Sequence, residues 1–191
     1  MKKYFTAILF ILSVSANAQM HLLNPNNDIS NALSKVLADY PNQFVNIKGT
    51  MIDQDVQTTD YTCSVNIPNA DSSVITQTGA EKDHVYSWKT VLLSTDDYNK
   101  AKLKFHEYYS RVKTASASIG GNKITLHGDY EGPDDSKRFA TVLLTPAPET
   151  GALKDVVVDL SMQYVLSIWQ ISVSVYEHKD YGVDKQQTEG N

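Results

Sequence analysis

Apolar residues recur at helical spacing in two stretches of this chain and alternate with polar residues along much of the remainder. From residue 29 to 40 they repeat every three or four positions, which predicts an amphipathic helix that ends at Pro41. A second repeat, from 98 to 112, predicts another helix, which we expect to begin at Ser94 with the serine hydroxyl as its cap. Strands are expected at 45–51, 61–67, 74–77, 85–93, 123–130, 137–145, 153–162 and 167–176. This pattern predicts an α+β protein with a largely antiparallel sheet and two helices on one face.

The order of these elements also admits a division into two tandem αβββ units, residues 28–93 and 94–176. Three pairs of residues keep nearly constant spacing: Gly49 and Gly128 (79 apart), Pro68 and Pro146 (78 apart), and the two tryptophans, Trp88 and Trp169 (81 apart). At an offset of 78, Tyr61, Cys63 and Val65 align with Phe139, Thr141 and Leu143. A duplicated unit would explain this spacing. Two unrelated amphipathic stretches would also align loosely, so both interpretations stay open.

The first eighteen residues have the three parts of a secretory signal peptide. Lys2 and Lys3 precede an apolar run at 7–14, and small residues ending at Ala18 form an A-x-A cleavage pattern. The apolar run is too short to span a bilayer, and no cysteine lies near the cleavage pattern to take a lipid anchor. We therefore expect an exported protein, periplasmic or extracellular, with no membrane span and no lipid anchor. Its expected parts are a signal peptide (1–18), a leader (19–27), a single α+β domain (28–180) and a flexible tail (181–191).

Charge and cysteine content narrow the class of protein further. Without Lys2 and Lys3 the 17 basic residues fall to 15, against 22 acidic residues, which gives a net charge of −7. An acidic chain without a concentrated basic patch repels phosphate backbones, so we expect no nucleic-acid partner. The single cysteine, Cys63, alternates with Tyr61 and Val65, which predicts an inward-facing thiol that acts as a small hydrophobe rather than a nucleophile.

One histidine stands beside a carboxylate in a predicted turn. Asp83 and His84 lie at the mouth of the hairpin that precedes the 85–93 strand. A carboxylate there could orient the imidazole as a general base or as part of a ligand site. A solvated turn explains the same two residues equally well, so they are candidate site residues with a structural alternative.

The most acidic segment of the chain surrounds a Gly-Pro turn. Its four carboxylates are those of Asp129, Glu131, Asp134 and Asp135. Clustered oxygen ligands on a loop suit a hard cation such as calcium, which makes these residues candidate metal ligands. The segment lacks the residue order of a calcium-binding EF-hand loop, and the adjacent Lys137 and Arg138 can neutralise it. A solvated hairpin turn is therefore the favoured interpretation, with no metal.

Specific catalytic motifs are missing from the sequence. It contains no phosphate-binding P-loop, no dinucleotide-binding glycine pattern, no G-x-S-x-G elbow and no H-E-x-x-H zinc motif. We therefore expect a non-enzymatic binding or accessory module without a cofactor, whose partner is a protein or a component of the cell envelope. The alternatives are a hydrolase-type enzyme with dispersed catalytic residues and a structural or assembly component of the envelope.

Overall fold

A nine-stranded antiparallel sheet and two α-helices make up the described part of this 191-residue chain, which confirms the predicted α+β class. The structure is a computed structural model that describes residues 28–79, 84–149 and 151–178. The helices are α1 (Asp28–Asp39) and α2 (Tyr98–Lys113), with short 3-10 helices η1 (Tyr40–Asn42) and η2 (Gly151–Leu153). The strands are β1 (Lys48–Gln54), β2 (Thr58–Cys63), β3 (Val74–Thr78), β4 (Val85–Thr95), β5 (Ser116–Ile119), β6 (Asn122–His127), β7 (Phe139–Ala147), β8 (Val156–Val165) and β9 (Ile168–Glu177). The predicted signal peptide, leader and tail lie outside the described residues.

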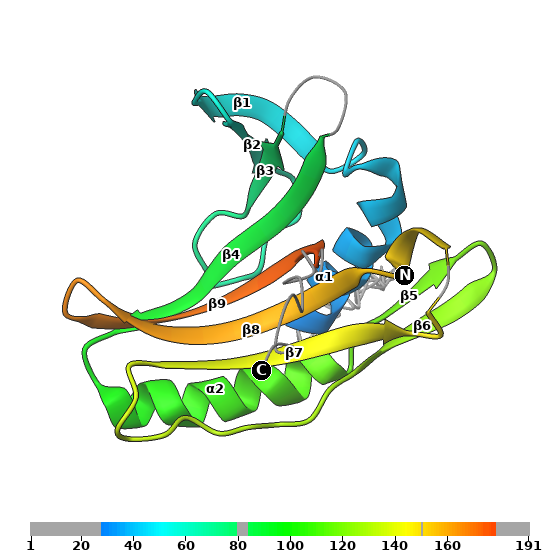
Figure 1. The fold of residues 1–191 in the computed structure, drawn as a ribbon. Coiled ribbons are helices and arrows are strands. Elements are labelled where there is room, and N and C mark those ends of the chain that lie inside the picture. The colour runs from blue at the N-terminus through cyan, green and yellow to red at the C-terminus, as the bar shows by residue number, and fades with distance from the viewer. Residues whose placement is uncertain (1–27, 80–83, 150, 179–191) are drawn as a thin grey trace, which may run out of the picture.

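The strands follow the order β1-β2-β3-β4-β9-β8-β7-β6-β5 across the sheet. Each group of strands that follows a helix forms a meander, and the last strands of the two groups, β4 and β9, pair at the centre. Four strands follow α1, as many as the expected ranges placed there, and five follow α2, one more than expected. Figure 1 shows the strong twist that results, with β1–β3 turned away from β7 and β8.

Both helices pack their apolar faces on the same face of the sheet. In α1 the buried residues recur at helical spacing, as predicted, and those of α2 are Ala101, Phe105, Tyr109 and Val112. They share one core with inward side chains of the central strands: Ile75, Trp88, Leu160, Ile171, Val173 and Val175. In the part of the chain that the structure describes, no helix has the length and apolar character needed to cross a membrane.

The two tryptophans occupy related places in the central ladder. Val91 of β4 pairs with Ser172 of β9, and each tryptophan stands three residues before one member of that pair. Trp88 pairs with Val175, and Trp169 pairs with Thr95. Both rings are buried among the core residues. The ladder is not fully symmetric about this pair, because its register shifts by one residue between Val91 and Leu93.

The expected alignment at an offset of 78 residues fails in the β2 and β7 strands. Tyr61 packs against the core, whereas Phe139, its expected counterpart, is 61% exposed. In β7 the residues that enter the core are Val142 and Leu144. Because strand side chains alternate between two faces, an alignment that is one residue out of register reverses every side chain.

The prediction that Ser94 caps the second helix is wrong. Ser94 belongs to β4, where it pairs with Gln170, and α2 starts only at Tyr98. Asp97 is the cap, because its side chain accepts a hydrogen bond from the backbone N–H of Lys100 at 3.0 Å. Pairing with β9 extends β4 past the point where the local sequence pattern would begin a helix.

Strand β5 was not expected from the sequence. The residues Ser116–Ile119 follow α2 directly and pair with β6 through a tight turn. Gly120 and Gly121 make that turn with φ values of +57° and +82°, which glycine adopts without the steric cost of a side chain. Gly120 and Gly121 therefore form the turn of a β-hairpin.

Candidate functional site

His84 lies at the start of β4 and is held by a neutral amide. Its Nδ1 atom is 2.9 Å from Nε2 of Gln77, a β3 residue that pairs with Tyr86 in the β3–β4 ladder. The hydroxyls of Tyr61 and Tyr86 donate to Oε1 of the same glutamine at 3.0 and 3.1 Å. The Gln77 amide therefore donates to His84, which leaves the ring proton of a neutral imidazole on Nε2. Asp83, the expected carboxylate partner, lies outside the described residues.

Lys48 completes this group of side chains, which we call the tyrosine–lysine cluster (Lys48, Tyr61, Gln77, His84 and Tyr86). The Lys48 ammonium lies 4.7 Å from the centroid of the Tyr61 ring and 4.5 Å from that of Tyr86. A cation between two aromatic faces is stabilised by their electron density. The cluster joins β1 to β4 and supplies hydrogen-bond donors.

A cavity of about 170 Å³ lies beside this cluster, lined in part by Tyr40, His84, Tyr86 and Glu177. Burial, together with the nearby carboxylates of Glu177 and Asp155, raises the pKa of Tyr40 to about 12. A phenol with that pKa stays protonated near neutral pH and acts as a donor. The chemistry of this cavity therefore suits the positioning of a small polar group better than proton abstraction.

The acidic segment forms a long loop between β6 and β7, and this loop runs along α2 (Figure 1). Asp135 accepts hydrogen bonds from the Tyr98 hydroxyl at 2.8 Å and from the Lys102 ammonium at 2.7 Å. These bonds lower the pKa of the Asp135 carboxyl. The loop is thus more than a solvated hairpin turn, since Asp135 binds side chains of α2.

Asp134 has a different partner from Asp135. Asp134 accepts two hydrogen bonds from Ser136, one from its backbone N–H and one from its hydroxyl, each 2.8 Å long. These bonds lower the pKa of Asp134. In the described ranges, His, Cys, Asp and Glu side chains form no group of three or more that could hold a metal ion.

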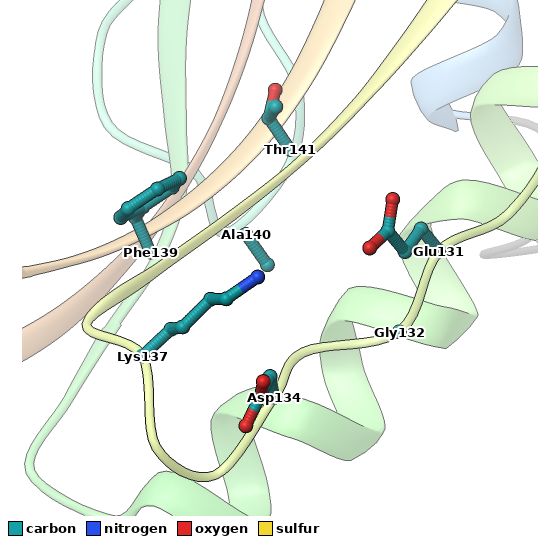
Figure 2. A pocket seen from close by; sticks show the side chains of 7 residues that line it. All are labelled: Glu131, Gly132, Asp134, Lys137, Phe139, Ala140 and Thr141. Atoms are coloured by element: carbon teal, nitrogen blue, oxygen red, sulfur yellow. The ribbon is translucent and has the colours of Figure 1, made fainter.

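A pocket of about 190 Å³ separates this loop from β7 (Figure 2). Glu131 and Asp134 line it, but Asp129 and Asp135 do not. The Lys137 side chain extends into the space between the loop and the strand, whereas Phe139 points to the other side of the strand. Because a metal cation would meet the Lys137 ammonium, the pocket does not suit calcium.

A larger groove lies on the face of the sheet that the helices leave uncovered. It has a volume of about 510 Å³. Besides Trp88, whose ring is buried in the core, the lining residues are Thr76, Thr78, Val85, Ser87, Lys89, Ser174, Tyr176, Glu177 and His178. We call this the open sheet groove. It arises from alternation, because residues next to the buried Ile75, Trp88 and Val175 project from the opposite face.

Hydrogen bonds hold Thr76 and Tyr176, two of the side chains that line the open sheet groove, in place. The Thr76 hydroxyl donates to Asp60 at 2.6 Å on one side. On the other side Asp159 accepts from the hydroxyls of Thr141 at 2.8 Å and Tyr176 at 3.4 Å. Burial is the largest cause of the raised pKa of Tyr176, with Asp159 contributing. The face therefore offers hydroxyls and carboxylates in fixed positions.

Cys63 packs against the core but remains half exposed at the end of β2. Its sulfur accepts a hydrogen bond from the backbone N–H of Val65 at 3.4 Å. Burial raises the pKa of the thiol and outweighs that hydrogen bond. A thiol with a raised pKa is a weak nucleophile at neutral pH, in keeping with a packing role.

Sequence reasoning selected His84 and the acidic residues by type and missed the open sheet groove. Serine and threonine at alternate positions of the predicted strands were the available signal, but they form no distinctive motif. Comparison with known proteins gives no match: no family model, no curated protein and no solved structure is similar to this chain. The geometry of the sites therefore carries the functional argument.

Proposed function

We propose that this protein is an exported binding module that holds a component of the cell envelope in the open sheet groove. The observation that carries the proposal is the groove itself, about 510 Å³ of open space across β3, β4 and β9. Ligand sites of small molecules and polymer segments commonly have volumes of about 300 to 1,000 Å³. The two helices occupy the other face and leave this one accessible.

The lining of the open sheet groove favours a partner rich in hydroxyl groups, such as a glycan. Thr76, Ser87 and Ser174 supply hydroxyls, and Lys89 supplies a cation. Because the Thr76 hydroxyl is already held by Asp60, this side chain loses little conformational entropy when a ligand binds. The ring of Tyr176 adds an apolar surface on which a sugar could rest.

The state of His84 and of two carboxylates in the acidic loop supports a binding role over a hydrolase-type enzyme. Among the described residues His84 contacts the neutral Gln77 amide, whereas a catalytic histidine is commonly oriented by a carboxylate. In the acidic loop, hydrogen bonds lower the pKa values of Asp134 and Asp135. A general acid at neutral pH needs the opposite shift.

Export and duplication form part of the same proposal. The basic, apolar and small-residue parts of the first eighteen residues support export, and mass spectrometry should find the mature N-terminus at or near Gln19 without an acyl chain. A product that retains Met1 would contradict export. The spacing of 81 between the tryptophans supports a duplicated ancestor, as does the position of each tryptophan three residues before one member of the Val91–Ser172 pair.

Retention of the protein on fractionated cell envelope tests the binding role. Ser87→Arg places a long cation in the groove, and Lys89→Ala removes its ammonium. We expect each variant to lower retention at least tenfold. Ser118→Arg on β5 and Lys123→Ala on β6 make the same chemical changes at exposed positions outside the groove and should bind normally. Equal retention of all four variants would refute binding in the open sheet groove. Release of hydrolysis products from the envelope would favour an enzyme.

A further inference from the structure

One row of residues crosses the uncovered face of the sheet and carries a charge of each sign. From β7 to β4 the row consists of Leu143, Asp159, Ser174 and Lys89, each directly opposite the next in the strand ladders. Residues directly opposite each other in paired strands project from the same face. Because Ser174 and Lys89 line the open sheet groove, the row runs through the groove and continues beyond it to β7. We call these four residues the charged row.

The two charges of the row have no ionic partner in the part of the chain that the structure describes. Asp159 accepts its hydrogen bonds from the hydroxyls of Thr141 and Tyr176, which are uncharged groups. Lys89 is exposed, and no described residue forms an ion pair with it or with Asp159. The row therefore presents a carboxylate held by two hydroxyls and a cation that a ligand can reach.

Strand β9 separates Lys89 from Asp159. Neighbouring strands lie about 4.8 Å apart, so the backbones at the two positions are roughly 10 Å apart. Ser174, which stands between them, offers a hydroxyl. The groove lining also includes the carboxylate of Glu177, three residues beyond Ser174 on β9, so the lining has no excess of positive charge. A ligand that carries one charge of each sign suits this arrangement better than a simple anion or cation.

We propose that the envelope component held in the open sheet groove carries an ammonium group and a carboxylate roughly 10 Å apart, as a short peptide does. Its carboxylate lies beside Lys89 and its ammonium beside Asp159, with Ser174 between them. Leu143, 45% exposed at the β7 end of the row, contacts the hydrocarbon part of the ligand next to the ammonium. This inference rests on the function proposed for the groove and narrows its partner to one that carries both charges.

Small probes separate a requirement for both charges from general affinity for the groove. The probe 8-aminooctanoate carries an ammonium and a carboxylate at the two ends of one alkyl chain, whereas octanoate and octylammonium each carry one charge. Because an exposed ion pair contributes little, we expect NMR titrations of the purified protein to show 8-aminooctanoate binding about threefold more tightly than either. Equal binding of the three probes would overturn the inference. So would unchanged signals of Lys89 and Ser174 at millimolar concentrations of each probe.

Matched variants locate the two charges. Lys89→Gln should remove the advantage of 8-aminooctanoate over octylammonium, and Asp159→Asn should remove its advantage over octanoate. Lys123→Gln on β6 and Asp53→Asn on β1 make the same chemical changes at exposed positions outside the row and should keep both advantages. If circular dichroism shows that Asp159→Asn does not fold, Lys89→Gln still decides, because it changes only an exposed side chain. An advantage over octylammonium that survives Lys89→Gln would overturn the charged row as the site.

Retention on cell envelope distinguishes failure of this inference from failure of the proposed function. If Ser87→Arg lowers retention but the three probes bind equally, the groove remains the binding site and only the requirement for both charges is refuted. If 8-aminooctanoate is preferred but Ser87→Arg leaves retention unchanged, the charged row selects such ligands and binding of the envelope in the groove is refuted.

Discussion

Replacing Trp88 with alanine should remove a large share of the free energy of unfolding. Trp88 is fully buried in β4, between Ile75 of β3 and Val175 of β9. A buried tryptophan removes about 150 to 250 Å² from water, worth roughly 4 to 6 kcal/mol at ~25 cal/mol per Å². Its indole N–H interacts with the Cys63 sulfur, a weak acceptor, and makes no conventional hydrogen bond. That unsatisfied donor offsets roughly 1 to 3 kcal/mol of the gain, so we expect a net loss of about 3 kcal/mol.

Urea unfolding followed by circular dichroism measures this loss directly. A change of about 3 kcal/mol should lower the melting temperature by roughly 6 to 12 °C in a domain of this size. Leu103→Ala is the control, because Leu103 lies on α2 with 74% of its surface exposed and should change stability little. A loss below about 1 kcal/mol for Trp88→Ala, at an unchanged dependence on urea, would refute the assigned burial.

Three further predictions test local features. Asp97→Ala should lower the free energy of unfolding by about 1 kcal/mol, since it removes the cap of α2. Thermal unfolding measures this change, and an unchanged stability would contradict the assignment of Asp97 as the cap. Leu166 and Ser167, at the tip of the β8–β9 hairpin, have φ values of 48° and 70°. Asparagine and glycine adopt such values more readily, so the double variant Leu166→Asn, Ser167→Gly should raise the free energy of unfolding by about 1 kcal/mol. A lower free energy of unfolding would show that the leucine packs favourably there. The pKa of Tyr40 is raised from 10.0 to about 12, so its contribution to stability is complete below pH 10 and is lost as the pH rises toward 12. Tyr40→Phe should flatten that part of the stability profile, and an unchanged profile would contradict the assigned environment.

Much of the fold could be predicted because side-chain periodicity records which face of an element is buried. The stripe of α1 and the alternation in β4 and β9 are examples, since their inward residues are apolar. Prediction failed where the secondary structure of a residue depends on pairing with a strand that is distant in the sequence. Ser94 resembles a helix cap in its local sequence, yet pairing with Gln170 keeps it in a strand.

The candidate site was less predictable for a related reason. His84 and Asp135 could be selected by residue type, but their partners depend on the tertiary fold. The partner of Asp135 is Lys102, 33 residues away, and that of His84 is a glutamine on the neighbouring strand. The open sheet groove offered even less signal, because its serines and threonines become a site only when three strands lie side by side.

An NMR titration with the solubilised envelope fraction that retains the protein tests the central claim most directly. Proton–nitrogen correlation spectra report the environment of each backbone amide. Binding in the open sheet groove should shift the signals of Thr76, Ser87, Lys89 and Ser174 and leave those of Leu103 unchanged, since that exposed residue of α2 lies outside the groove. Shifts confined to residues outside the groove, or none with any envelope fraction, would contradict the account.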